Sequence, residues 1–317
     1  ALEANTTGES NVALGRFALT ANTTASDNTA VGNYSLDANT TGDRNVAVGY
    51  NALTTNTVGD RNVAIGYGAL KTMDPSSNAD TMNVGVGYNA LENTSTGINN
   101  TGVGGYVMQA NTTGTDNVAI GEQALVSNTT GDNNTAIGAN ALDNNTTADN
   151  NVAVGKSALD ALTTGTRNTA VGTYALDAST TQSDNTAIGY NACGAANGGG
   201  QLTGVGAYTL SDNTTANRST AFGYYALKAN TTGDDNCAFG ASALDANTTG
   251  GYNVAMGSHA MGKSNGGQNV AIGYYALEEN TTGNYNVAVG SEALTSNTTA
   301  DDNTAIGYKA LFTNSTG

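Results

Sequence analysis

Apolar and polar positions along this chain follow one pattern that recurs every 17 residues. In residues 286–302 it reads Asn-Val-Ala-Val-Gly-Ser-Glu-Ala-Leu-Thr-Ser-Asn-Thr-Thr-Ala-Asp-Asp, and we number its positions 1 to 17. Position 5 is glycine in 18 copies, and fifteen of the 17 intervals between these glycines span 17 residues, while one spans 21 and one 16. They are Gly15, Gly32, Gly49, Gly66, Gly87, Gly104, Gly121, Gly138, Gly155, Gly172, Gly189, Gly206, Gly223, Gly240, Gly257, Gly273, Gly290 and Gly307. A fixed short period is typical of a solenoid, in which each repeat contacts mainly its neighbours.

Positions 1 to 5 predict a short β-strand that ends at the glycine. Position 1 is Asn in 16 of 18 copies, position 2 is Val or Thr apart from Cys237, and position 3 is Ala or Gly. Position 4 is always apolar, so that large and often β-branched residues alternate with small ones, as strands favour. The glycine at position 5 predicts a positive φ or a backbone too crowded for a Cβ atom.

Positions 8 and 9 read Ala-Leu in nearly every copy and predict a second short strand, whereas Asn-Thr-Thr-Gly at positions 12 to 15 is typical of a turn. Such short strands bury their apolar residues only when coils stack. The pattern therefore predicts an all-β parallel β-solenoid, or β-roll, of 18 coils with 17 residues and two short strands per coil. We expect structural ladders that include Asn45, Val48, Gly49 and Leu53, with asparagine side chains bonded along the stack.

The small residues at position 3 indicate that something packs closely against them. Either position 3 lines the narrow interior of the coil, or a neighbouring subunit packs on that face, and the sequence leaves both open. The two cysteines stand at otherwise apolar positions, Cys193 at position 9 and Cys237 at position 2. Three coil steps would separate them by roughly 14 Å, which exceeds the about 7 Å that a disulfide spans, so we expect no disulfide within the chain.

We expect residues 1–317 to form a single repeat array. Residues 71–82 include four extra residues and the sole proline, Pro75, and predict a loop insertion within the array. The chain starts and stops inside a repeat, so we expect it to be a piece of a longer array. Open solenoid ends expose unpaired strand edges, which would favour end-to-end stacking into a filament.

Composition and charge narrow the class of protein. The chain has 42 glycines, one proline and a formal net charge of −16. Such an acidic chain is disfavoured as a partner of nucleic acid or of anionic membranes, and no segment has the apolar length of a membrane span. Disorder is the rival interpretation of so polar a chain, but 38% hydrophobic residues in a fixed register favour a folded array.

The coil motif, seen in Asn45, Val46, Ala47, Val48 and Gly49, resembles the head repeats of trimeric autotransporter adhesins. It is also similar to repeats in bacteriophage tail fibres and related surface fibres, and the resemblance covers the whole chain. It implies a left-handed parallel β-roll, often trimeric, that serves as a stalk or an adhesive head. The adhesin coil is shorter, and here Asn-Thr-Thr-Gly supplies the extra length.

No pattern of residues supports catalysis. The one histidine, His259, occupies a variable position, and no triad, metal cluster or phosphate-binding loop is visible, so we predict that the chain is not an enzyme and needs no cofactor. Carboxylates at positions 16 and 17 raise the alternative of Ca²⁺ held by oxygen ligands. We favour a solvated edge that arginines partly neutralise. The candidate cation ligands are Asp43, Asp60, Asp234, Asp235, Asp301 and Asp302.

Asn-Thr-Thr at positions 12 to 14 is also an N-glycosylation sequon. The candidate acceptors are Asn5, Asn22, Asn39, Asn111, Asn128, Asn145, Asn213, Asn230, Asn247, Asn280 and Asn297. The alternative, which we favour, is a turn whose asparagine bonds to its own backbone. Tyrosines near positions 6 and 7, such as Tyr274 and Tyr275, would form a carbohydrate-binding strip, or would cover the edge of the coil or a seam between subunits.

These observations predict a non-enzymatic structural fibre or filament protein of an extracellular, cell or virion surface. It would self-associate as a homo-oligomer, either as a trimer or as an end-to-end filament. The alternative is an adhesin head that binds surface glycans or a cell surface. A more distant alternative is an ice-binding solenoid, which would need a flat array of outward threonines.

Overall fold

The computed structural model describes residues 1–77 and 79–314. The chain divides into two compact units, Ala1–Thr164 and Gly165–Gly317, and both are built from the same repeat. Within each unit a repeat makes one coil and contributes one three-residue strand at positions 2 to 4. The described residues contain strands and turns but no helix. The predicted all-β parallel solenoid with about one 17-residue repeat per coil is therefore confirmed, while the single array over 1–317 stays a prediction.

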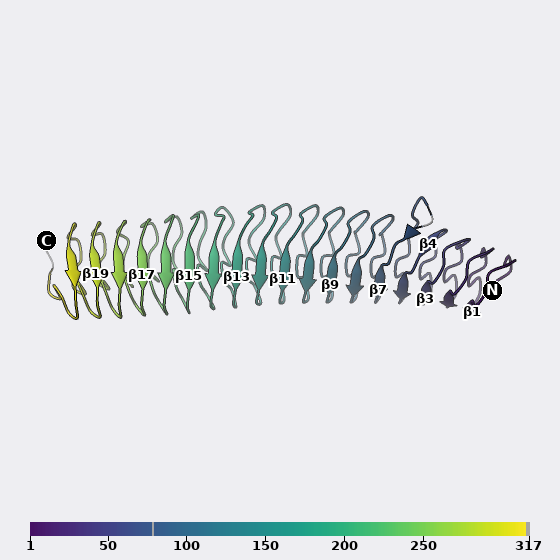
Figure 1. Ribbon diagram of the computed structural model, residues 1–317, viewed down its shortest axis with the longest axis horizontal. Coiled ribbons are helices and arrows are strands. Elements are labelled where there is room, and N and C mark those ends of the chain that lie inside the picture. The colour runs from purple at the N-terminus through teal and green to yellow at the C-terminus, as the bar shows by residue number, and fades with distance from the viewer. Residues whose placement is uncertain (78, 315–317) are drawn as a thin grey trace. The chain divides into compact units, whose positions relative to one another are not determined.

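Each unit holds nine three-residue strands that pair in parallel with their neighbours. In the first unit they are β1 (Val12–Leu14), β2 (Thr29–Val31), β3 (Val46–Val48), β5 (Val63–Ile65), β7 (Val84–Val86), β8 (Thr101–Val103), β9 (Val118–Ile120), β10 (Thr135–Ile137) and β11 (Val152–Val154). In the second unit they are β12 (Thr169–Val171), β13 (Thr186–Ile188), β14 (Thr203–Val205), β15 (Thr220–Phe222), β16 (Cys237–Phe239), β17 (Val254–Met256), β18 (Val270–Ile272), β19 (Val287–Val289) and β20 (Thr304–Ile306). Figure 1 shows these arrows at the same place in successive coils of each unit.

Parallel pairing joins residues that occupy the same position in successive repeats. Between β2 and β3, Ala30 lies opposite Ala47. The same register holds across the two irregular intervals, where β5 pairs with β7 and β17 pairs with β18. Identical positions therefore lie above one another within each unit, as the repeat predicts.

Position 3 faces the interior of the coil. Ala47 and Ala64 are fully buried. Where glycine replaces alanine the space is tighter still, since a Cβ atom on Gly204 would lie 2.7 Å from Sγ of Cys193. Of the two interpretations of position 3, the narrow interior is confirmed.

Position 4 stacks as predicted, but its side chains do not enter the core. Successive side chains of a strand point to opposite faces, so positions 2 and 4 face outward when position 3 faces inward. Val48 is half-buried, and Ile65, which lies opposite it in β5, is 39% exposed. The core consists instead of position 3, the Ala-Leu pair at positions 8 and 9, and buried asparagines.

The second strand predicted at positions 8 and 9 is wrong. Positions 6 to 11 form turns in which positions 7 and 9 have positive φ, as in Asn51 at 55° and Leu53 at 53°. These left-handed residues fold the chain back so that Leu53 is fully buried, and no extended run is left to make a strand. The turns still pair along the stack, because the N–H of Leu53 donates to the carbonyl oxygen of Ala69 at 2.9 Å.

The glycine at position 5 meets both conditions that the sequence predicts. Gly49 has a φ of 138°, and a Cβ atom on it would lie 2.3 Å from the carbonyl oxygen of Gly66 in the next coil. Successive coils therefore touch backbone to backbone at this corner, where only glycine fits.

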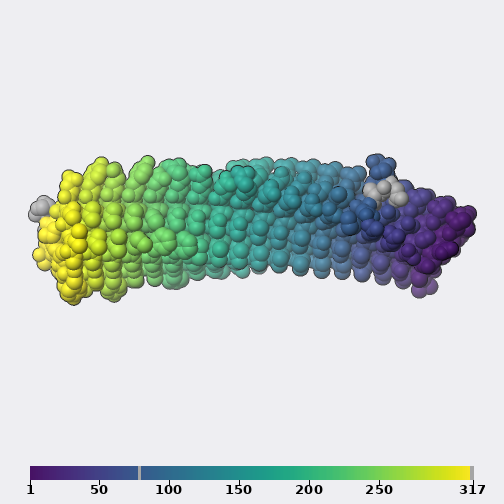
Figure 2. Space-filling model, viewed as in Figure 1, coloured from purple at the N-terminus to yellow at the C-terminus, as the bar shows by residue number. Residues whose placement is uncertain are grey.

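The insertion at 71–82 is a loop with an anchored base. A short parallel pair, β4 (Gly59–Asp60) and β6 (Ala79–Asp80), joins it to the preceding coil. Met73 and Pro75 are buried, and Pro75 Cγ lies 3.1 Å from where a Cβ atom of Gly59 would be. Asn78 falls outside the described residues. Figure 2 shows the loop standing above the adjacent coils of the first unit.

Candidate functional site

Asparagine at position 1 forms a buried ladder. The backbone N–H of Asn45 donates to Oδ1 of Asn28 at 2.9 Å, and Asn45 Oδ1 accepts the N–H of Asn62 at 2.9 Å. Asn45 Nδ2 donates to the carbonyl oxygen of Gly59 at 2.8 Å, and all three asparagines are fully buried. The predicted ladder is confirmed. Because an unpaired buried polar group costs about 1–3 kcal/mol, the ladder explains why position 1 hardly varies.

A second buried amide ladder runs through position 12, which the sequence assigns to a turn. Asn56 Nδ2 donates to Oδ1 of Asn39 and to the carbonyl oxygen of Gly59, both at 3.0 Å. The N–H of Gly59 returns a bond to Asn56 Oδ1 at 3.0 Å. Position 12 is Asn in 12 of 18 copies and uncharged in the others, and this was the signal that the residue lies inside.

The second ladder includes every candidate glycosylation site. Ten of the eleven sequon asparagines are fully buried, and only Asn5, in the first coil, is exposed. In all eleven, Nδ2, the atom that a glycan would occupy, donates to the carbonyl oxygen three residues later. The structure thus shows the turn-bonding alternative. A glycan on any of the ten buried sites would break the ladder.

Threonine hydroxyls at position 13 also bond along the stack. Thr23 Oγ1 donates to the carbonyl oxygen of Thr40 at 3.1 Å, and Thr40 Oγ1 donates to that of Thr57 at 3.0 Å. These hydroxyls are therefore engaged within the coil. The flat outward array that an ice-binding surface needs is not formed by this row, although Thr24 at position 14 is exposed.

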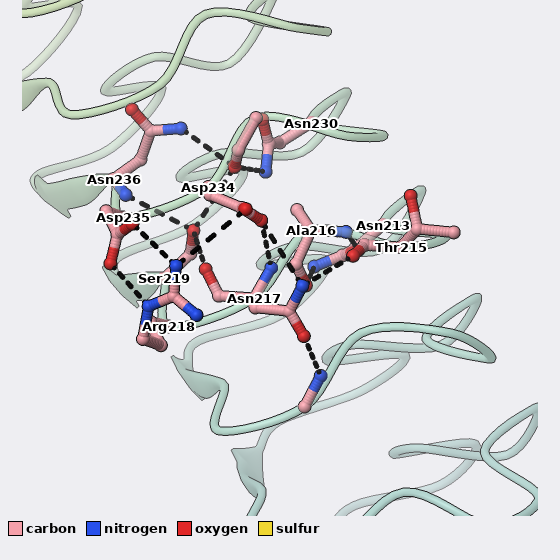
Figure 3. Close-up of polar contacts among 12 residues, drawn as sticks. Asn213, Thr215, Ala216, Asn217, Arg218, Ser219, Asn230, Asp234, Asp235 and Asn236 are labelled. Atoms are coloured by element: carbon pink, nitrogen blue, oxygen red, sulfur yellow. Dashed lines mark hydrogen bonds and ion pairs between the residues drawn. The ribbon is translucent and has the colours of Figure 1, made fainter.

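Carboxylates at position 16 form a third ladder of hydrogen bonds between coils. Asp60 Oδ1 accepts the N–H of Asp43, and Asp43 Oδ1 accepts that of Ser26, each at 2.7 Å. The same contact joins Asp234 to Asn217 at 2.7 Å (Figure 3). Asp301 Oδ1 likewise accepts the N–H of Asn284 at 2.6 Å. Among the described residues no three His, Cys, Asp or Glu side chains are grouped so as to hold a metal ion, and Ca²⁺ stays an untested prediction.

Position 17 forms exposed ion pairs between coils. The guanidinium group of Arg218 donates two hydrogen bonds of 2.8 Å to the carboxylate of Asp235 (Figure 3). They lower the pKa of that carboxyl below its ordinary value. Arg167 pairs with Asp184 in the same way. Asp302 is exposed, and its N–H donates to the carbonyl oxygen of Asn284 at 3.1 Å. The solvated edge with arginine counter-charges is thus what the structure shows at these positions.

Aromatic side chains at positions 6 and 7 form a row in each unit. In the first unit the ring centroids of successive coils are 5.1 to 5.9 Å apart. The row consists of Phe17, Tyr34, Tyr50, Tyr67, Tyr88 and Tyr106. Tyr67 and Tyr88 stack with 8° between their planes, and both are 48% exposed. Where rings stack in this way, their faces cover one another and their edges meet solvent. A row in the second unit joins Tyr174, Tyr190, Tyr208 and Tyr225.

His259 lies against an aromatic ring rather than beside a nucleophile. Its ring stacks on Tyr275 with centroids 5.0 Å apart. Burial raises the pKa values of two carboxyls near it, Asp245 and Glu278. The described residues enclose no pocket, and they include no helix long and apolar enough to cross a membrane.

The outward face of the sheet is a surface feature that sequence reasoning did not identify. We call the side chains at positions 2 and 4 the outer stripe. Position 2 is Val, Thr or Cys and position 4 is Val, Ile, Leu, Phe or Met, so no charged residue occurs at either position in any copy. Ile120, Ile188 and Ile272 are each about two-fifths exposed. Large contiguous apolar patches on a protein surface are typical of interaction sites.

No protein-family model matches the chain, and no curated protein matches it. The fold and the ladders define its class, a β-solenoid repeat protein. Its surface chemistry is the basis for any assignment of function.

Proposed function

We propose that this chain is a structural fibre protein of an extracellular, cell or virion surface, whose copies pack side by side through the outer stripe. The observation that carries the proposal is the stripe itself, which has no charge, is apolar at every position 4, and continues through the strands of each unit. A long column of partly exposed apolar side chains is unfavourable in water unless a partner covers it. The resemblance to surface-fibre repeats supports the same function.

The interior suits a mechanical role. Backbone bonds, two buried amide ladders and the carboxylate ladder all run from coil to coil, so a load along the unit would be shared among many parallel bonds. The only histidine is stacked on tyrosine, and we propose no catalytic role for the chain.

A second copy of this chain is the occupant that best fits the stripe. The chain carries a net charge of −16, yet the stripe has no charge to repel its own counterpart. With two outward positions on each of nine strands, one unit presents 18 stripe side chains. That number approaches the roughly 20–30 residues a side of a standard protein interface, and the ion-paired edge at position 17 would form its polar rim.

The test is the oligomeric state of the full chain by sedimentation equilibrium. We expect the unmodified protein to be a homo-oligomer. Ile120→Lys with Ile188→Lys would weaken association by at least about tenfold per site, because each lysine buries a charge in the contact. The matched control, Thr130→Lys with Thr181→Lys, places the same charges on exposed turns and should leave association intact. A monomeric wild-type protein at high concentration would overturn the proposal.

The second candidate function is an adhesin head, and the exposed tyrosine rows favour it. Tyrosine edges and hydroxyls face solvent along the first unit, where they could hydrogen-bond to surface glycans. Under this function, Tyr67→Ser with Tyr88→Ser abolishes binding to glycan arrays or to cells while the oligomeric state stays unchanged. Binding that survives these changes would exclude the tyrosine row as the adhesive site.

A further inference from the structure

One stretch of the outer stripe departs from its repeating composition. Position 4 carries Phe222, Phe239 and Met256 in the successive strands β15 to β17, and position 2 of β16 is Cys237. At every other copy position 4 is Val, Ile or, in β1, Leu14. The two phenyl rings stack with centroids 4.9 Å apart and 5° between their planes, and Phe239 and Met256 are 36% and 42% exposed. We call these four residues the aromatic patch.

The rest of the stripe hardly distinguishes one axial alignment of two packed copies from another. A shift of one coil, about 4.8 Å, would place Val or Ile on Val or Ile again, and Val or Thr on Val or Thr. Where neighbouring registers offer equivalent contacts, register is weakly specified and chains slip. Two such uniform faces would therefore pack in many alignments of similar stability.

The aromatic patch makes one of these alignments more stable than the others. A phenyl ring that packs against the Val and Ile of another copy is larger than its neighbours and holds the two faces apart. Voids then remain beside the ring, and the atoms that line them lose packing contacts. Only one alignment brings the patches of two copies together, and aromatic pairs gain stability beyond the area that they bury. We propose that the patch of Phe222, Cys237, Phe239 and Met256 fixes the axial register in which two copies pack. This inference rests on the proposed function, since it needs the stripe to be the contact.

Cys237 supplies a native reporter of whether the patch is covered. Its side chain is half-buried on the outer stripe, and both cysteines are free. Cys193 lies in the core, where burial raises its pKa to about 12, so its thiol is unreactive while the protein is folded. The alkylation rate of the native chain therefore reports the accessibility of Cys237 alone.

The first experiment follows Cys237 alkylation as protein concentration rises through the association range, with oligomer mass measured on the same samples. We expect the rate to fall about tenfold or more on association, because a covered thiol is shielded from the reagent. An unchanged rate in an associated sample would place the patch outside the contact and overturn the inference, while leaving the proposed function standing. A protein that never associates overturns both.

The second experiment maps register by disulfide trapping. A tagged wild-type chain is mixed with Cys237→Ser chains that each carry one cysteine at a position 2 or 4, taken in turn along the stripe. Since a disulfide needs Cα atoms within about 7 Å, we expect Cys237 to be trapped by one coil and its immediate neighbours. Trapping spread evenly over many coils in the wild-type background would contradict a fixed register.

A third experiment uses variants to test whether the aromatic side chains fix the register. Phe222→Val with Phe239→Val restores the uniform column and should keep the oligomer but spread the trapping over several coils. The matched control, Ile188→Val with Ile272→Val, trims the same column outside the patch and should keep the wild-type pattern. If disulfides in the phenylalanine variant are confined to as few coils as in the control, the patch does not fix the register.

Discussion

Asn28 and Asn39 donate their side-chain amides to one acceptor, the carbonyl oxygen of Gly42, at 3.0 and 2.9 Å. Asn28 belongs to the ladder at position 1 and Asn39 to the ladder at position 12. The carbonyl at position 15 thus joins the two ladders. Both lie in the core, so a coil with Asn at positions 1 and 12 contains a small polar network that is complete only when the next coil is present.

Breaking the position-12 ladder with a charge should be far worse than replacing it with an apolar side chain. Asn128→Asp puts a carboxylate where Asn128 Nδ2 now donates to Asn111 Oδ1 at 2.9 Å. It should cost about 3 kcal/mol or more of unfolding free energy, because two acceptors then face each other in a buried site. Asn128→Leu should cost less, since leucine already occupies this position at Leu162. Urea unfolding compares the two with Thr130→Ala, an exposed control.

The corner glycine should tolerate no side chain. Gly49→Ala forces a Cβ atom to within 2.3 Å of the Gly66 carbonyl oxygen and strains a φ of 138°, so we expect a loss of about 3 kcal/mol or more. Gly105→Ala is the control in the same unit, because a Cβ atom there meets nothing within 4 Å. Equal melting temperatures for the two variants would contradict the close contact between coils.

Two classes of aspartate should respond to pH in opposite directions. Burial, and then the charge of Asp143, raise the pKa of Asp160 above 3.8, so the folded state binds its proton more tightly than the unfolded state. Its contribution to stability therefore rises as pH falls through the raised value. Arg218 lowers the pKa of Asp235, whose contribution is lost as pH falls below 3.8.

Melting curves between neutral pH and pH 4 check the first of these signs. We expect Asp160→Asn to raise the melting temperature near neutral pH and to reduce the gain on acidification. Asp235→Asn serves as the comparison and should lower the melting temperature near neutral pH, because it removes the ion pair with Arg218. A lower neutral melting temperature for Asp160→Asn would show that its partners outweigh its burial.

Glycan attachment should distinguish folded from unfolded chain. An oligosaccharyltransferase offered the folded protein should modify Asn5 and leave Asn39 and Asn128 unmodified, because their amide nitrogens are buried and bonded. The same enzyme offered the denatured chain should modify all three. Glycopeptide mapping reads the outcome, and modification of Asn128 in a protein that keeps its native melting curve would contradict the second ladder.

The repeat alone predicts the solenoid, the coil length and the ladder at Asn45, because stacking follows directly from identical residues at a fixed period. It does not predict the left-handed turn at Leu53, since leucine on its own avoids positive φ and only burial in the coil compensates that strain. Nor does it predict which face of a three-residue strand is inside. Position 2 is Val, Thr or Cys, position 4 is apolar and position 3 is small, so composition leaves open which of them faces the interior.

Burial of Asn39 was hidden for a different reason. Asn-Thr-Thr-Gly has the local chemistry of an exposed turn, and its asparagine becomes a core residue only because the neighbouring coils close over it. The outer stripe was missed because the sequence leaves open whether position 3 faces the interior or a neighbouring subunit. The repeat predicts that Val48 stacks in a ladder, but not that its side chain is half-exposed on the outward face.

Cryo-electron microscopy of the assembled full chain tests the central claim most directly. We expect that copies meet through the outer stripe, with Ile120 and Ile188 buried between them and the tyrosine rows left at the margin. An assembly in which the stripe faces solvent, or in which copies meet through the turns at positions 12 to 15, would contradict it.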